Sequence, residues 1–164
     1  MSTIPFDDER LSAGLGERGA SLGRGGDGMP RIEVGAGEAL EILRWLRDDA
    51  ALGFDRLFDL TIVDRGDGVD GVGQLDVVYV LDASASGARL RVHARLESEA
   101  VELASVVPLW PAADWLEREA FDLFGLRFRG HPGLHRILLP ADFEGAPLRR
   151  SPFPTPLRPE GESR

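Results

Sequence analysis

The chain has 164 residues, of which 43% are hydrophobic, and carries a formal net charge of -9. This length and composition suit one domain with a single core, and no run approaches the roughly 18 apolar residues that span a bilayer. No cysteine is present, which excludes disulfides and thiolate-bound iron–sulfur clusters in this chain. The acidic charge argues against nucleic-acid binding and against attraction to anionic lipid headgroups. Without an apolar span or an export signal, we expect a cytoplasmic protein with no direct membrane insertion.

Residues 1–30 are rich in glycine, serine and charged residues and show no apolar periodicity. We therefore predict a flexible N-terminal segment there. A phosphate-binding loop is a poor alternative, because no strand precedes the glycines and no Gly-Lys-Ser/Thr follows them. We place one α+β domain in residues 31–128 and an extended docking tail, rich in proline and arginine, in residues 129–164.

The apolar pattern of the domain predicts one helix among four strands. Residues 31–34 can form a short strand, and residues 38–50 place three leucines and an isoleucine on one helical face. Three more strands, joined by short Gly- and Asp-rich turns that favour antiparallel pairing, are predicted at residues 56–64, 75–82 and 89–96. With a second helix further along, the fold class is α+β: a two-layer sandwich of a small, mostly antiparallel sheet of about four strands with two main helices, plus an extended C-terminal tail.

The last of these strands, residues 89–96, alternates strictly between apolar and polar side chains. One face carries only apolar residues and is predicted to face the core. The other face is a positive ladder of Arg89, Arg91, His93 and Arg95. We interpret this ladder as a solvated face whose charges pair with the acidic turns, or as a contact surface for an acidic neighbour.

A second helix is predicted to begin near Pro111, which suits a first turn because its missing N–H has no partner there. Asp114 adds a negative charge near the positive end of the helix dipole. Gly125 can adopt a left-handed conformation, so we expect the helix to end after Phe124.

The charged residues of this helix allow two interpretations. Glu117 lies one turn from two phenylalanines, so we expect its carboxylate to be partly desolvated or to have a cationic partner. Arg118 and Asp122 are spaced for a modest ion pair. Sequence physics alone favours a solvated face for the run from Glu117 to Glu119, since charge runs on helices are usually solvated.

The same segment carries a recognisable pattern. Glu117-Arg118-Glu119 is followed by Asp122-Leu123-Phe124, by His131-Pro132 and by Ile137-Leu138-Leu139-Pro140. With upstream strings that include Leu109-Trp110-Pro111, this order and spacing resembles the family of the 30 kDa-type subunit of proton-pumping NADH-quinone oxidoreductase, respiratory complex I. The similarity covers about residues 31–150, which is more than a short motif.

The resemblance implies a non-catalytic structural subunit in the hydrophilic arm of a complex that passes electrons from NADH through iron–sulfur clusters to quinone, coupled to proton translocation. It implies no cofactor in this chain, with the iron–sulfur clusters and FMN in partner subunits. The implied partners are the large quinone-pocket subunit and small iron–sulfur subunits. The complex would place this chain, as a peripheral protein, on the cytoplasmic side of the cell membrane, with NADH and quinone bound only at the level of the complex.

The tail suits such docking, because its prolines restrict the backbone and its arginines offer forked donors to carboxylates. We expect Arg118 and Glu119 to fix the helix against the tail or a partner. Arg136, Arg149 and Arg150 are expected to pair with partner carboxylates. The full set of predicted interface residues is Glu117, Arg118, Glu119, Asp122, His131, Arg136, Leu138, Leu139, Phe143, Arg149 and Arg150.

Three alternatives stay open at this stage. His131 and His135 are four residues apart, and with a helix carboxylate they could form the metal site of a small free-standing enzyme, although Pro132 and Gly133 disfavour a helix between them. A related membrane-bound hydrogenase subunit would share the family resemblance. An interaction module of an unrelated assembly would keep the docking surface alone.

Overall fold

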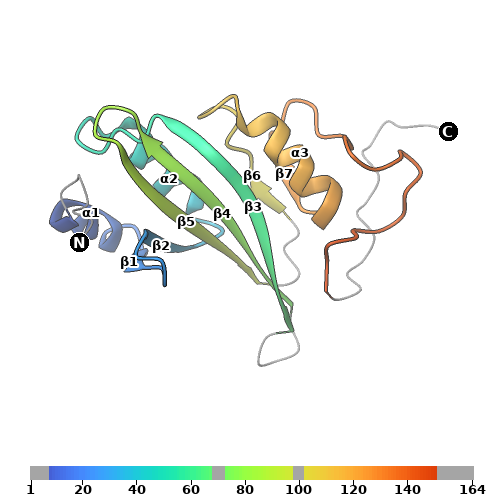
Figure 1. The fold of residues 1–164 in the computed structure, drawn as a ribbon, viewed down its shortest axis with the longest axis horizontal. Coiled ribbons are helices and arrows are strands. Elements are labelled where there is room, and N and C mark those ends of the chain that lie inside the picture. Colours follow the sequence, from blue (N-terminus) through green and yellow to red (C-terminus); the bar gives the residue numbers. More distant parts are fainter. Residues whose placement is uncertain (1–7, 68–72, 98–101, 151–164) are drawn as a thin grey trace.

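The computed structural model of the protein describes residues 8–67, 73–97 and 102–150. Predictions for residues 1–7, and for the tail beyond residue 150, lie outside these described residues. Figure 1 shows the arrangement of the helices and strands.

Five strands form the main sheet, in the order β1-β2-β5-β4-β3. Neighbouring strands pair antiparallel, except that β2 and β5 pair parallel. The predicted α+β fold with a mostly antiparallel sheet is confirmed, and each of the four predicted strands is present. The strands are β1 (Ser21–Arg24), β2 (Pro30–Gly35), β3 (Arg56–Asp67), β4 (Gly73–Ala83) and β5 (Ala88–Glu97).

We predicted a flexible N-terminal segment at residues 1–30, but regular structure is present within residues 8–30. Helix α1 (Asp8–Gly16) and strand β1 lie there. Leu11 and Leu15, one helical turn apart, are fully buried in the core. Gly14 lies against the indole of Trp45, since a Cβ added at this glycine would be 2.5 Å from Cζ2 of that ring. The glycine that made the segment look flexible therefore permits close helix packing.

The core lies between the helices and one face of the sheet. Helix α2 (Ala39–Asp48) buries the apolar stripe that its sequence predicts, and in Figure 1 the strands β3, β4 and β5 lie in front of it. The apolar face of β5 is buried as predicted, at Leu90, Val92, Ala94 and Leu96. Both predicted layers of the sandwich are thus present.

Helix α3 (Ala113–Phe124) ends as its sequence predicts. Gly125 is left-handed, with φ 72°, and its N–H donates to the carbonyl of Phe121 at 2.9 Å. Strands β6 (Glu102–Ala104) and β7 (Arg127–Arg129) precede and follow α3 and pair parallel with each other. These two strands were not predicted, because three residues are too short to show an alternating pattern.

No helix within residues 8–67, 73–97 and 102–150 is long and apolar enough to cross a membrane.

Candidate partner-binding site

Asp122 anchors the tail to α3. Its side chain is fully buried, and Oδ2 accepts the backbone N–H groups of Ile137, Leu138 and Leu139 at 3.0, 2.7 and 3.0 Å. Burial alone would raise the pKa of Asp122, but the hydrogen bonds from Leu139 and Leu138 and from the guanidinium of Arg136 outweigh burial, so the pKa lies below its usual value. An ionised carboxylate therefore fixes residues 136–139 against the helix.

Arg136 completes this anchor and does not extend toward a partner. Its Nη1 donates to Oδ1 of Asp122 at 2.6 Å, and its Nη2 donates to the carbonyls of Phe143 and Gly145 at 3.1 and 3.3 Å. In this structure the protein itself supplies the carboxylate that was expected from a partner. The expected pair between Arg118 and Asp122 does not form, since Asp122 binds Arg136.

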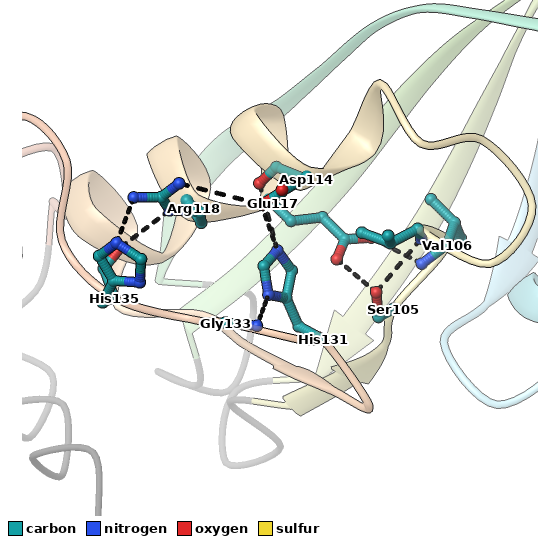
Figure 2. A network of polar contacts seen from close by, with 9 residues as sticks. Ser105, Val106, Asp114, Glu117, Arg118, His131, Gly133 and His135 are labelled. Atoms are coloured by element: carbon teal, nitrogen blue, oxygen red, sulfur yellow. Dashed lines mark hydrogen bonds and ion pairs between the residues drawn. The ribbon is translucent and has the colours of Figure 1, made fainter.

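Arg118 makes a second contact between α3 and the tail (Figure 2). Its Nη2 donates to Nε2 of His135, and its Nε lies 3.4 Å from the carbonyl oxygen of His135. The guanidinium also lies over the ring of Trp115, 4.6 Å from the ring centroid. Arg118 is buried by these contacts, whereas the neighbouring Glu119 is exposed.

His131 forms a third contact, on the first turn of α3. Its Nδ1 accepts the N–H of Gly133 at 3.0 Å, so Nε2 carries the proton of the neutral ring and faces the carbonyl oxygen of Asp114 at 3.2 Å. Figure 2 shows that the imidazoles of His131 and His135 contact different residues of α3. The metal site considered for these histidines is not formed, and the described part of the protein holds no group of three or more His, Asp or Glu side chains that could bind a metal.

Glu117 lies inside the protein and not on the expected interface. Its side chain is fully buried, and its carboxylate accepts the hydroxyl of Ser105 and the N–H of Val106, both at 2.6 Å. Burial raises the pKa of Glu117 to about 7, against the opposing effect of these two hydrogen bonds. The expectation of a desolvated carboxylate was right, and no cation is needed because two donors of the loop after β6 satisfy it.

The two remaining arginines of the predicted interface differ. Arg149 has an almost fully buried side chain, with Nε 4.0 Å from the carboxylate of Asp64. Arg150 is exposed, and its backbone N–H binds Asp64 at 2.8 Å. The N–H of Leu148 donates to the carbonyl of Leu123 at 3.1 Å, so the end of the described tail also lies along α3.

Several side chains of α3 and the tail point into solvent although they are apolar. Leu138, for example, is 58% exposed, and Leu139 next to it is half-buried. Trp115 and Leu148 were not among the interface residues predicted from the sequence. The signal that could have identified them is that neither belongs to an apolar stripe that faces the core. We use the name α3–tail surface for the exposed residues Trp115, Glu119, Leu138, Phe143, Leu148 and Arg150.

Comparison with known proteins places this protein in a family. Residues 32–156 match the family described as the 30 kDa subunit of respiratory-chain NADH dehydrogenase. The sequence is 43% identical over 132 residues to the C subunit of NADH-quinone oxidoreductase from Azoarcus sp. (strain BH72), covering 77% of this chain and 65%, just under two thirds, of that relative. It is 43% identical over 149 residues to the corresponding subunit from Burkholderia mallei (strain SAVP1), covering 88% of this chain and 73% of that one.

Two solved structures share the fold of this protein. A trypsin-resistant fragment of Nqo5 superposes with a TM-score of 0.66 at 30% identity and covers 77% of this chain and 98% of the fragment. A polypeptide of a membrane-bound sulfane sulfur reductase, an archaeal respiratory complex, shares the fold, with a TM-score of 0.64 at 21% identity over 80% of this chain and 75% of that polypeptide. The predicted resemblance is confirmed: this chain belongs to the family of the 30 kDa subunit of respiratory-chain NADH dehydrogenase.

Proposed function

We propose that this protein is a non-catalytic structural subunit in the hydrophilic arm of an NADH-quinone oxidoreductase. Family membership supports this role, and the curated relatives are named as a subunit of that complex. The sequence has no cysteine, so thiolate-bound clusters would have to lie in other subunits.

The observation that carries the proposal is the α3–tail surface. Its apolar side chains are exposed, yet the backbone that bears them is fixed by the contacts of Asp122, Arg118 and His131. A tail that is ordered before binding loses little conformational entropy on docking. Exposed aromatic and aliphatic side chains on such a fixed frame are typical of the anchors at the centre of protein interfaces.

The partner proposed for this surface is the large subunit that forms the quinone pocket, with small iron–sulfur subunits nearby. In this proposal the iron–sulfur clusters and FMN reside in the partners, and NADH and quinone bind only to the complex. The protein would lie at the cytoplasmic side of the cell membrane as a peripheral protein. Its contribution to electron transfer and proton translocation would be to hold the partner subunits in position.

Leu138→Asp tests the proposal, because it places a charge on one of the most exposed apolar side chains of the α3–tail surface. The Leu138 side chain is 58% exposed and its N–H remains bonded to Asp122, so the variant should fold normally. Losing a buried anchor at an interface costs about 2 kcal/mol or more, or roughly thirtyfold in affinity. We expect less assembled complex on native gels and a matching loss of NADH–quinone reductase activity in membranes.

Ala51→Asp is the matched control, since Ala51 is exposed in the loop after α2, outside the α3–tail surface. It should assemble like the wild type. Arg150→Glu offers an independent test, because Arg150 is exposed and its bond to Asp64 uses the backbone N–H, which the substitution keeps. Full incorporation of both Leu138→Asp and Arg150→Glu into an active complex would refute the proposed docking.

A further inference from the structure

A second surface lies on the side of the sheet that faces away from the core. We use the name outer sheet face for the outward residues of β3, β4 and β5. Figure 1 views the sheet with α2 behind these strands. Phe58 and Val63 of β3, 60% and 39% exposed, lie on the outer sheet face. The outer sheet face therefore exposes apolar side chains to solvent, in addition to those exposed on the α3–tail surface.

Charges on the outer sheet face are arranged in two levels. Asp82 and Asp76 have side chains that are 8% and 0% exposed, and they lie beneath arginines. Arg89 donates to both carboxylate oxygens of Asp82, at 2.5 and 2.8 Å, and Arg56 donates to the same group at 3.2 Å. Arg65 lies 2.5 Å from Asp76. The ladder charges thus pair mainly with neighbouring strands of the sheet, and not only with acidic turns.

A molecule that approaches Asp82 or Asp76 consequently meets guanidinium groups before it meets these two carboxylates. The side chains of Arg56 and Arg89 remain 64% and 41% exposed although both bind Asp82. A guanidinium has five N–H donors, and each of these arginines uses only one or two on Asp82. The buried carboxylate also fixes the guanidinium in place, so less rotamer entropy is lost when an external acceptor binds.

An exposed aromatic ring lies within this arginine cluster. The register of β3 and β4 shifts between Leu57 and Asp59, so Phe58 occupies an irregularity of the edge strand. The guanidinium of Arg89 lies over the Phe58 ring, 4.0 Å from its centroid. Aromatic residues and arginines are the residue types enriched at the centres of protein interfaces.

A pocket of about 430 Å³ lies at the other end of the outer sheet face, lined by Gly19, Glu33, Val34, Gly35, Ala36, His93 and Arg95. His93 is 8% exposed, and neither ring nitrogen has a hydrogen-bond partner within the described residues, although Nδ1 lies 3.6 Å from the carboxylate of Asp76. Buried polar groups usually have partners in native proteins. A polar side chain that entered the pocket would supply one.

We propose that the outer sheet face is a second docking surface, which binds an acidic segment of another protein. The exposed guanidinium groups of Arg56, Arg89 and Arg95 pair with its carboxylates, and Phe58 supplies the apolar contact. A polyphosphate such as RNA fits less well, because it needs a broad positive footprint. Here carboxylates lie directly beneath the arginines, and the whole sequence has a net charge of -9. The protein would then join two partners, one on each side.

Site-specific photocrosslinking tests this inference in the full complex. A photoreactive phenylalanine analogue at position 58 replaces an exposed ring, so folding and assembly should be unaffected. We expect an adduct with a second polypeptide, and its crosslinked peptide should contain or adjoin several Asp or Glu residues. Arg56→Ala should lower the yield about fivefold, and so should a rise in salt, because charge pairs at an interface are screened by ions.

The controls use Arg44, an exposed arginine of helix α2 and not of the sheet. The analogue at position 44 of α2 should give no comparable adduct, and Arg44→Ala should leave the yield from position 58 unchanged. No adduct above the position 44 background would overturn the inference, and so would an adduct with nucleic acid, with lipid, with a second copy of this protein or with a peptide lacking acidic residues. A complex that assembles normally without the adduct would leave the proposed function standing.

Discussion

Asp122→Asn should detach the tail from α3 while leaving the side-chain volume unchanged. Asp122 accepts three backbone N–H groups and one guanidinium N–H within a fully buried site. Hydrogen bonds to a charged group contribute about 1.5–3 kcal/mol each, and removing one partner of a buried ion pair costs about 3–5 kcal/mol. Arg136 keeps its bonds to the carbonyls of Phe143 and Gly145, and the asparagine oxygen still accepts one or two N–H groups. We therefore expect a loss of about 3 kcal/mol.

Two assays on the isolated protein measure the loss of stability and the detachment of the tail. Urea unfolding at pH 7 gives the free energy of unfolding, and trypsin cleavage after Arg149 and Arg150 reports release of the tail. Asp142→Asn, in the exposed part of the same tail, is the matched control and should behave like the wild type. If Asp122→Asn and Asp142→Asn had equal stability and equal cleavage rates, the anchor described for Asp122 would be wrong.

The same carboxylate gives a pH dependence with a defined sign. Its pKa is lower in the folded protein than the ordinary value of 3.8. The stabilisation is therefore complete above pH 3.8 and is lost as the pH falls through the folded-state pKa. Asparagine does not titrate, so the difference between wild type and Asp122→Asn should shrink in acid.

Three further changes test the interior. Glu117 has a pKa raised from 4.5 to about 7. As the pH rises from 4.5 to 8, the free energy of unfolding of the wild type should therefore fall by about 3 kcal/mol relative to Glu117→Gln, measured by urea titration at each pH. Parallel stability curves for the two proteins would contradict this. Gly14→Ala should destabilise the protein by about 1–3 kcal/mol in thermal unfolding, because the added Cβ meets the ring of Trp45. Gly16→Ala is the control and should not destabilise the protein, because the space around Gly16 is open. Leu11→Ala should cost about 3 kcal/mol in the same assay, and a neutral result would mean that α1 does not belong to the core.

The elements predicted correctly are those that local patterns define. Strand β5 has strict alternation, and the end of α3 has Gly125, which adopts the left-handed conformation expected of it. Helix α1 escaped prediction because its two buried leucines are the main apolar signal among glycines and charged residues. A periodicity that rests on one pair of residues cannot be distinguished from chance.

The candidate site was harder to predict, because charge in a sequence does not reveal the partner of that charge. Arg136 was assigned to a partner carboxylate, yet it binds Asp122, 14 residues earlier in the sequence. Glu117 was assigned to the interface, yet it is buried against the loop after β6. These pairs depend on how the tail and the loop after β6 pack against α3, and local periodicity carries no information about that packing.

Purification of the tagged protein from gently solubilised membranes decides whether it is a structural subunit. The expected result is co-elution, in fixed stoichiometry, with a large quinone-pocket subunit and iron–sulfur subunits, together with NADH–quinone reductase activity. Leu138→Asp should co-elute with much less of these subunits, while Ala51→Asp should retain them. Wild-type protein that elutes alone from membranes with intact reductase activity would contradict the structural role.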